Sequence, residues 1–371
     1  MSLEKLAEIS RFYGGNPEYV IAGGGNTSFK DDEFLYVKAS GTSLAQSKPE
    51  DFVKMSRSKL ALIWKKDYPP EPEAREADVL KDMMAGRCPG EENKRPSVET
   101  LLHDLLPFAY VVHLHPALVN GLSCSQEGQS AANKLFPDAL WIPSINPGFI
   151  LSQAVKKALD AKKGESQNQS VILLQNHGIF VAANTTEEIK KIYEQVMEVL
   201  GKKIKNSPDF SGEVDSFGNS EALGKEILNL ARRHKSGAEW FIKFSRNRQI
   251  EAFTADEASF KPISSAFSPD HIVYYGSEAL FINDTSKLET AFKAFLEKTS
   301  KVPQIIAVKS LGVFGLAISQ RALGNALELF KDSQKIAVFS MSFGGPRFMD
   351  DDKIDFINNW EMERYRSKVS T

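Results

Sequence analysis

The sequence predicts a protein of the α/β class with two domains. Short apolar segments rich in β-branched residues, which are typical of buried strands, alternate with segments whose apolar residues recur at helical spacing. A polar stretch near 205–222, rich in Ser, Gly, Asn and Asp, interrupts this pattern. The length of 371 residues is sufficient for two domains of ordinary size.

Four segments in the first half have the composition of buried strands: 34–38, 109–113, 171–175 and 179–183. The last two flank a polar turn with a glycine and therefore predict a hairpin. Thr185 and Glu188 then fit a capping box, with Thr185 as the N-cap. Apolar residues recur from Ile189 to Leu200 along one helical face, so a helix is expected to follow the hairpin.

We expect a first domain at 1–207, a linker at 208–221 and a smaller C-terminal α/β domain at 222–371. A polar segment at 65–96 predicts a long loop excursion in the first domain. Segment 172–189 can be laid without gaps over 306–323, and His177 then falls on Leu311. This likeness indicates either a common strand-turn-strand-helix unit or a degenerate repeat whose second copy lacks a ligand.

The charge balance limits the classes of function. With 46 basic and 48 acidic side chains, the formal net charge is −2, which argues against a nucleic-acid binder that relies on bulk electrostatics. Two cysteines cannot form a disulfide scaffold, and no apolar run approaches the roughly 18 residues of a membrane span. The first residues lack the pattern of a signal peptide. A cytoplasmic protein that binds neither membrane nor nucleic acid is expected.

Three histidines form a candidate metal site. His113 and His115 end an apolar segment, and residues i and i+2 of a strand point to the same side. His177 lies in the predicted turn before a glycine. Three imidazoles with an open position suit catalytic zinc. The alternative for the His-x-His pair alone is a structural pair on an edge strand.

A candidate carboxylate precedes these histidines. Ser97 is followed by good helix formers and predicts an N-cap, so that Glu99 would lie in the first turn. Glu99 is either a functional acid or a carboxylate that favours the helix dipole. His103, four residues later, shares its helix face and is predicted to support the site or to pack.

Two loops of small residues predict an anion site. Residues 22–28 contain three consecutive glycines, and residues 39–43 read Ala-Ser-Gly-Thr-Ser. Glycines allow several backbone N–H groups to converge on an anion, although a flexible turn is the alternative. Neither loop fits a Walker or dinucleotide-binding pattern.

In this order, the motifs GGGNTSFK, VKASGTSL, RPSVETLLH, VVHLHP and QNHGIF resemble the class II aldolase/adducin family. The chain most resembles the aldolase portion of bifunctional rhamnulose-1-phosphate aldolase/alcohol dehydrogenase proteins. That likeness extends to SPDHIVYYG (268–276), KSLGVFGLA (309–317) and NNWEMERYRSKV (358–369). It implies a class II aldolase-like three-layer domain with a central, mainly antiparallel sheet.

The resemblance also implies roles for individual residues. His113, His115 and His177 would bind Zn²⁺, and Glu99 would be the catalytic acid/base. The phosphate of the substrate would contact the remaining family positions, which are Gly25, Asn26, Ser40, Gly41 and Ser97. Val98 replaces a second serine of the small aldolases, which removes one hydroxyl from that set.

The implied activity is zinc-dependent cleavage of a ketose 1-phosphate, such as L-rhamnulose 1-phosphate, to dihydroxyacetone phosphate and an aldehyde such as lactaldehyde. The enzyme would act on a small phosphorylated sugar as a homo-oligomer. A related epimerase, dehydratase or decarboxylase would use the same site, since fold and ligands do not separate these reactions. A non-catalytic adducin-like binding protein is the third hypothesis.

Overall fold

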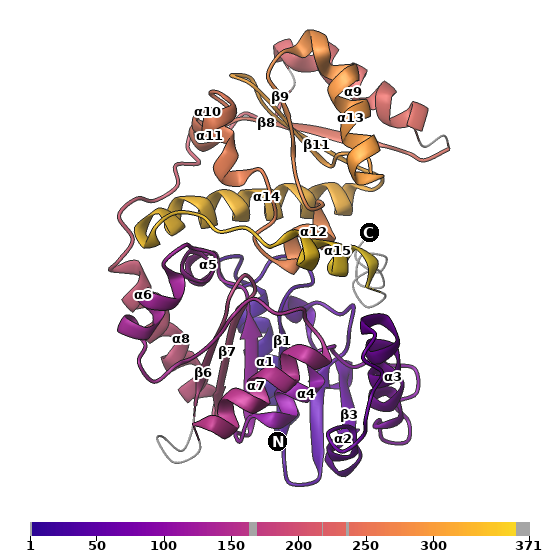
Figure 1. The fold of residues 1–371 in the computed structure, drawn as a ribbon, viewed down its shortest axis with the longest axis vertical. Helices are drawn as coiled ribbons and strands as arrows, with labels where there is room; N and C mark the ends of the chain where they lie inside the picture. Colours follow the sequence, from indigo (N-terminus) through magenta and orange to yellow (C-terminus); the bar gives the residue numbers. More distant parts are fainter. Residues whose placement is uncertain (1, 163–168, 217, 235–236, 361–371) are drawn as a thin grey trace. The chain divides into compact units, whose positions relative to one another are not determined.

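The computed structural model describes residues 2–162, 169–216, 218–234 and 237–360 (Figure 1). The chain forms two compact units, which we describe separately. Unit 1 comprises Met1–Ser123, Glu127–Lys203 and Trp360–Met362, and unit 2 comprises Cys124–Gln126, Ile204–Asn359 and Glu363–Thr371. Residues 361–369 of the C-terminal resemblance lie outside the described residues, and the predicted domain boundaries remain predictions. No helix within the described residues is both long and apolar enough to cross a bilayer.

Unit 1 is built on a seven-stranded sheet in the order β3-β2-β1-β4-β7-β6-β5. All neighbours are antiparallel except β5 and β6. The strands are β1 (Asn26–Lys30), β2 (Phe34–Lys38), β3 (Phe52–Ser56), β4 (Tyr110–Leu114), β5 (Leu140–Ile142), β6 (Val171–Leu174) and β7 (Gly178–Ala183). The four strands expected from the sequence are therefore present to within one residue at each end.

Helices cover both faces of this sheet. On one face, apolar residues of α4 and α7 pack on β4, β6 and β7, while α1 and α8 lie on the other. The helices of unit 1 are α1 (Ser2–Gly14), α2 (Arg57–Ile63), α3 (Pro72–Ala85), α4 (Thr100–Leu105), α5 (Ala117–Ser123), α6 (Gly128–Leu135), α7 (Phe149–Ala161) and α8 (Thr186–Gly201). The capping box of Thr185 and Glu188 at the start of α8 is confirmed.

The polar segment 65–96 is not the structureless loop that its composition predicts. It contains α3, whose 14 residues begin with Pro72 at the first helical position. Val79 and Met83 of α3 are buried in a cluster with β2 and β3. Glu76 is also buried, and its carboxylate accepts a hydrogen bond from the Phe149 amide at 3.0 Å. A few inward-facing residues therefore hold a helix whose average composition is polar.

Unit 2 contains a smaller sheet in the order β8-β11-β10-β9, in which only β9 and β10 are parallel. Its strands are β8 (Phe241–Ser245), β9 (Leu280–Ile282), β10 (Ile305–Val308) and β11 (Gly312–Ala317). Its helices are α9 (Glu221–His234), α10 (Arg248–Phe253), α11 (Glu257–Phe260), α12 (Pro269–Tyr274), α13 (Leu288–Thr299), α14 (Gln320–Ser340) and α15 (Asp351–Asn359). Helices α9 and α13 pack on one face of the sheet in a single apolar cluster.

The two sheets share a pairing pattern. Strands β4-β7-β6-β5 of unit 1 and β8-β11-β10-β9 of unit 2 have the same sequence of antiparallel, antiparallel and parallel neighbours. The two sheets can be aligned on the glycines that begin β7 and β11. Phe244 then stands at the position of His113, and Leu311 stands at the position of His177. Unit 2 thus lacks metal-binding side chains at these positions.

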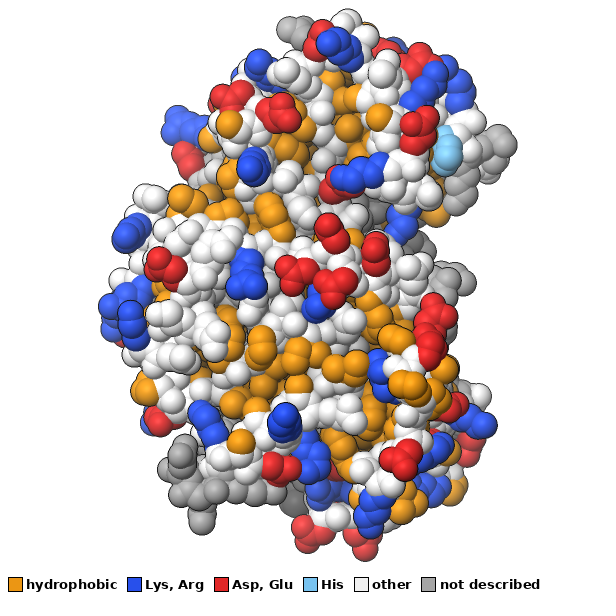
Figure 2. All heavy atoms as spheres, viewed as in Figure 1, with side chains coloured by type: hydrophobic (Ala, Val, Ile, Leu, Met, Phe, Trp, Pro, Cys, Tyr) orange, Lys and Arg blue, Asp and Glu red, His pale blue; other side chains and the backbone are white. Residues whose placement is uncertain are grey.

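Acidic and basic side chains are interspersed over the face of the molecule that Figure 2 shows. This distribution agrees with the nearly balanced charge of the sequence. An anion site on this chain would have to be local, as the glycine-rich loops predict.

Candidate metal centre

Three imidazole rings converge where β4 ends and the β6–β7 turn begins. His113 lies in β4, His115 follows that strand, and His177 precedes β7. One ring nitrogen from each histidine lies within 4.8 Å of the other two, and the Nε2 atoms of His113 and His115 are 2.9 Å apart. The predicted cluster is therefore assembled, and it could hold a metal ion.

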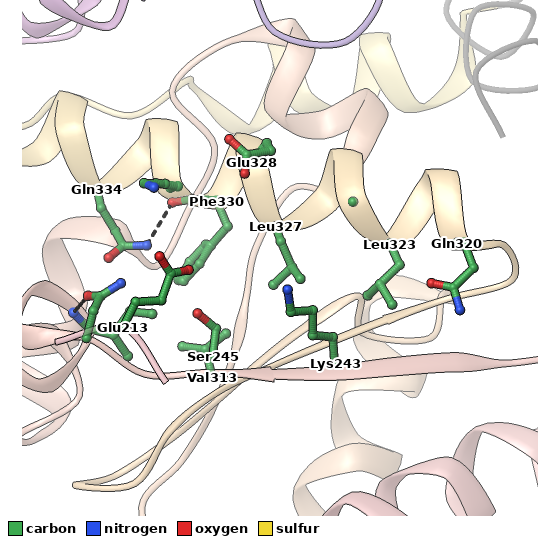
Figure 3. Close-up of a pocket in the computed structure, with 14 residues that line it drawn as sticks. Glu213, Lys243, Ser245, Val313, Gln320, Leu323, Leu327, Glu328, Phe330 and Gln334 are labelled. Atoms are coloured by element: carbon green, nitrogen blue, oxygen red, sulfur yellow. Dashed lines mark hydrogen bonds between the residues drawn. The ribbon is translucent and has the colours of Figure 1, made fainter. Parts of the chain in front are cut away.

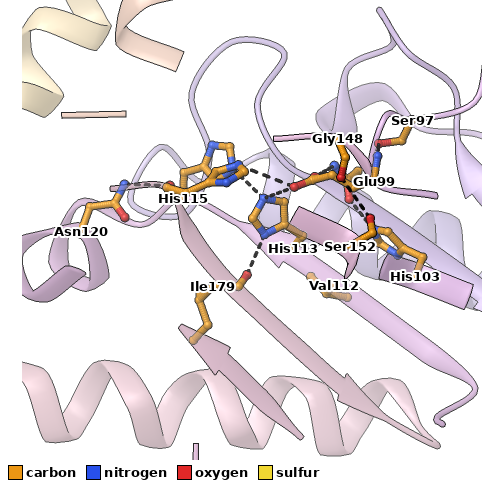
Figure 4. Close-up of polar contacts among 12 residues, drawn as sticks. Ser97, Glu99, His103, Val112, His113, His115, Asn120, Gly148, Ser152 and Ile179 are labelled. Carbon is orange, nitrogen blue, oxygen red and sulfur yellow. Dashed lines mark hydrogen bonds and ion pairs between the residues drawn. The ribbon is translucent and has the colours of Figure 1, made fainter. Parts of the chain in front are cut away.

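The ring of His113 is held in one orientation (Figure 4). Its Nδ1 lies 3.0 Å from the carbonyl oxygen of Ile179, to which it can only donate. The neutral tautomer then carries its proton on Nδ1, which leaves the Nε2 lone pair facing the cluster. The ring also stacks on Phe180, with centroids 4.0 Å apart and planes inclined by 14°.

Glu99 presents a carboxylate oxygen to the same point. The residue is only 4% exposed, and its Oε1 lies 3.4 Å from His113 Nε2 and 3.6 Å from His177 Nε2. This oxygen is buried and accepts no hydrogen bond. A buried carboxylate oxygen that accepts no hydrogen bond is costly unless a cation or a proton lies between it and the imidazole nitrogens. This arrangement fits a divalent metal.

The predicted N-cap at Ser97 is wrong. Helix α4 begins at Thr100, with Glu99 in the N-cap position and no hydrogen bond from its side chain to the helix. Pro96 forms a β-bridge with Ala39, so the chain is still extended there. A separate turn follows, in which the Thr100 amide donates to the Ser97 carbonyl at 3.1 Å. The Glu99 carboxylate is consequently turned away from the helix and towards the histidines.

A hydrogen-bonded chain from β1 fixes the other oxygen of Glu99. Asn26 Nδ2 donates to Glu99 Oε2 at 2.6 Å, and Asn26 Oδ1 contacts His103 Nε2. An amide oxygen only accepts, so His103 carries its proton on Nε2, and its Nδ1 accepts from the Ser28 hydroxyl at 2.7 Å. Complete burial, followed by repulsion from His113, lowers the pKa of His103 well below its ordinary value, which agrees with a neutral ring.

The side chains of β1 that take part in this hydrogen-bonded network come from every second residue of the strand. Asn26 and Ser28 of β1 both reach the side of α4, and Lys30 Nζ donates to the His103 carbonyl at 2.6 Å. The supporting role expected for His103 agrees with these contacts, whereas Ser28 was missed by sequence reasoning. Its signal was the polar residue at every second position of a buried strand.

Two glycines bring the backbone close to the histidines. A Cβ at Gly178 would lie 2.5 Å from the Leu114 carbonyl oxygen and 2.6 Å from His115 Cδ2. Gly25 has a φ of +67°, and a Cβ there would lie 2.8 Å from the His113 carbonyl oxygen. Both positions therefore exclude larger residues, since the obstructing atoms include backbone.

A few backbone contacts connect residues expected to bind phosphate with the histidine cluster and with the segment before Ser97. Asn26 pairs with His113 across β1 and β4. The Ser40 amide donates to the Arg95 carbonyl at 2.7 Å, which ties the second loop, including Gly41 with its φ of +86°, to the segment before Ser97. The Ser97 hydroxyl accepts from the Glu99 amide at 3.2 Å and keeps its own proton to donate.

Two further supports could not be identified from sequence. The fully buried Tyr193 of α8 donates its hydroxyl to the Val112 carbonyl at 3.0 Å and lies 3.4 Å from that of Ile179. Asn120 of α5 donates to the His177 carbonyl at 3.3 Å. Tyr193 lies within the apolar helical face 189–200, and periodicity does not show what its hydroxyl contacts.

Residues 4–201 match the model of the class II aldolase and adducin N-terminal domain. The chain belongs to this family. The match spans more than half of the sequence, and it contains every residue of the histidine and glutamate cluster. The resemblance stated from the motifs is thereby confirmed at the level of the family.

A curated relative comes from Bacillus subtilis (strain 168) and is named uncharacterized oxidoreductase YuxG. It is 27% identical over 324 residues, which cover 80% of this chain and 45% of the relative. The chain thus spans less than half the length of that relative. The relative is not named as a rhamnulose-phosphate enzyme, so this finer resemblance remains a proposal.

Two solved structures are among those similar to part of this chain. The N-terminal class II aldolase domain of a conserved protein from Thermoplasma acidophilum is 25% identical, with a TM-score of 0.47, and the match covers 55% of this chain and 94% of that one. L-Fuculose-1-phosphate aldolase from Thermus thermophilus is 16% identical, with a TM-score of 0.35, and the match covers 54% and 94% respectively.

Proposed function

We propose that the chain is a zinc-dependent aldolase that cleaves a ketose 1-phosphate to dihydroxyacetone phosphate and an aldehyde. L-Rhamnulose 1-phosphate, which would give lactaldehyde, is the first candidate substrate. The observation that carries the proposal is the buried Glu99 Oε1, which faces three convergent imidazoles and accepts no hydrogen bond. Membership of the class II aldolase and adducin family supports it.

His113, His115 and His177 would hold the metal. Zinc, when bound, supplies a Lewis acid that polarises carbonyl and hydroxyl oxygens of the substrate. The Ile179 carbonyl accepts from His113 Nδ1, so this ligand would present the lone pair of its Nε2 to the metal. Another divalent ion would suit the same nitrogen donors.

Glu99 would move the proton at the substrate carbon that becomes nucleophilic. In cleavage, the hydroxyl on C4 would lose its proton to Glu99, and the bond between C3 and C4 would break as the aldehyde carbonyl forms at C4. The electron pair left on C3 would then take that proton back from Glu99 Oε1. In synthesis the same oxygen removes it. Asn26 binds the other oxygen at 2.6 Å, which leaves Oε1 directed at the reacting centre.

The phosphate would be bound by Gly25, Ser40, Gly41 and Ser97, with Asn26 acting mainly through Glu99. The Ser40 amide is already bonded to Arg95, so its hydroxyl would be the group that contacts phosphate. The Ser97 hydroxyl can donate to phosphate while it accepts from the Glu99 amide. Phosphate binding would thus be coupled to the position of the catalytic acid. Val98 contributes no hydroxyl.

Product analysis tests this proposal. The zinc-loaded protein is incubated with L-rhamnulose 1-phosphate, L-fuculose 1-phosphate and L-ribulose 5-phosphate, and products are identified by NMR and by a coupled assay for dihydroxyacetone phosphate. We expect dihydroxyacetone phosphate from at least one ketose 1-phosphate. His113→Ala should abolish it, whereas the exposed His234 of unit 2 can be changed to alanine without loss. Epimerised, dehydrated or decarboxylated products would contradict the aldolase assignment, and the lack of any bound divalent ion would favour a non-catalytic protein.

A further inference from the structure

Unit 2 contains a cavity that the metal centre does not explain. It has a volume of about 300 Å³ and lies between helix α14 and the face of the sheet formed by β8 and β11 (Figure 3). Pockets of this size can enclose a small metabolite. Its walls combine apolar side chains of α14 with charged and amide groups from three segments of unit 2.

Comparison of the two sheets explains why this space is open. In unit 1 the fully buried Tyr193 and the Tyr13 ring of α1, with centroids 4.9 Å apart, cover the corresponding face. Leu327 of α14 stands eight residues after the N-cap residue Ser319. Tyr193 of α8 stands at the same distance from the N-cap residue Thr185, but the leucine side chain is smaller than the tyrosine side chain. The described residues 204–216, which precede β8, form no helix that could replace α1. The cavity therefore occupies the place of a tyrosine pair.

The same comparison shows that this face has become polar. Lys243 pairs with Gly315 as Val112 pairs with Val181, so a lysine stands on a face that is apolar in unit 1. A Cβ at Gly315 would meet Leu327 at 2.8 Å, which shows that this face is turned towards α14. Lys243 Nζ lies 3.5 Å from Asp215. The side chain of Lys243 is 47% exposed and that of Asp215 is 66% exposed, and a ligand carboxylate could replace such a weak pair.

One residue that lines the cavity carries an amide oxygen that has no hydrogen-bond partner. Gln334 of α14 is only 2% exposed, and its Nε2 donates to the Phe330 carbonyl at 3.2 Å. This bond shows which atom of the amide is nitrogen, because the Phe330 carbonyl oxygen can accept a hydrogen bond from the NH₂ group but not from the amide oxygen. The Oε1 atom is buried without a hydrogen-bond donor. A ligand with an N–H group would satisfy it.

Four charged residues line the cavity, namely Glu213 and Lys243 together with Glu328 and Lys331 of α14. The Glu213 carboxylate and the amide of Gln334 lie at the same end of the cavity, while Lys243 reaches towards Leu327 (Figure 3). A cation-binding end and an anion-binding group thus flank a wall of Leu323, Leu327 and Phe330. We propose that this cavity binds a small zwitterion with an apolar side chain, of the class of the aliphatic α-amino acids. The ammonium group contacts Gln334 Oε1 and Glu213, and the carboxylate contacts Lys243.

Calorimetry with three related probes tests this site on the full chain. L-Leucine carries both charges, 4-methylvalerate lacks the ammonium group, and 3-methylbutylamine lacks the carboxylate. We expect saturable binding of L-leucine and at least tenfold weaker binding of each singly charged probe. Lys243→Met should lower the affinity for L-leucine at least tenfold and leave the affinity for 3-methylbutylamine unchanged. Gln334→Met should lower the affinities for L-leucine and 3-methylbutylamine and leave the affinity for 4-methylvalerate unchanged.

Lys293→Met is the matched control, because Lys293 lies on α13, is 65% exposed in its side chain and does not line the cavity. It should bind L-leucine like the unchanged protein. Thermal unfolding of each variant shows whether it is folded, and the exposed Lys243 tests the site even if Gln334→Met does not fold. Failure of L-leucine to bind the unchanged protein, or equal affinities for Lys243→Met and Lys293→Met, would overturn the proposal.

Discussion

A methyl group at Gly178 tests whether the histidine cluster depends on the close approach of β4 and β7. In Gly178→Ala the new Cβ would lie 2.5 Å from the Leu114 carbonyl oxygen, whereas ordinary contacts begin near 3.4 Å. The difference, 3.4 − 2.5 = 0.9 Å, is the movement that the backbone or the methyl group must absorb. The His115 ring, 2.6 Å from the same Cβ, must move by a similar amount.

This displacement is large for a metal site, where ligand distances are held to within about 0.2 Å. We expect the metal affinity of Gly178→Ala to fall by at least about tenfold. A misplacement near 1 Å at a catalytic centre costs on the order of 10²-fold in turnover, so kcat/KM should fall by about that factor. Competition of the protein with a zinc-binding dye gives the affinity, and the aldolase assay gives kcat/KM.

Gly201→Ala is the control, because a Cβ at Gly201, the last residue of α8, meets no atom within 4 Å. It should keep both metal affinity and turnover. The reasoning would be refuted if Gly178→Ala bound zinc and turned over substrate as the unchanged protein does.

Three further changes probe the surroundings of the site. His103→Phe removes the acceptor for Ser28 and the donor for Asn26, so kcat should fall at least about tenfold while zinc remains bound. A kcat equal to that of the unchanged protein would exclude a positioning role for His103. The KM reports substrate binding separately. Tyr193→Phe loses a buried hydroxyl that donates at 3.0 Å, and the free energy of unfolding in urea should fall by about 1 kcal/mol; an unchanged value would contradict this role. Burial lowers the pKa of Lys30 to about 7, so the unfolded chain binds the extra proton between about pH 7 and 10.5, and stability should rise with pH in that window. Lys30→Met should flatten that rise, and an identical pH profile would show that Lys30 is not titrating there.

The sequence carried most of the information on the cluster itself. Period-two spacing placed His113 and His115 on one side of a strand, whereas the place of His177 beside them was implied by the family resemblance and depends on the pairing of β4 with β7. The capping box at Thr185 was found because its hydrogen bonds are local. Such features depend on neighbouring residues and can therefore be predicted.

The contacts that orient the cluster could not be predicted in the same way. Asn26 binds Glu99 across 73 positions of the chain, and this contact requires the packing of α4, which Glu99 precedes, beside β1. Ser97 failed as an N-cap because Pro96 remained extended against Ala39, which is a tertiary contact. The segment 65–96 failed for a related reason, since the burial of a few residues outweighed its polar average.

The central claim is that Glu99 acts as the acid/base beside a metal held by three histidines. The most direct measurement is the metal content and the turnover of Glu99→Gln, determined on the same sample. Because the three imidazoles remain, we predict about one zinc per chain and a loss of turnover of at least 10²-fold. A Glu99→Gln protein that keeps both its zinc and its aldolase activity would contradict the account.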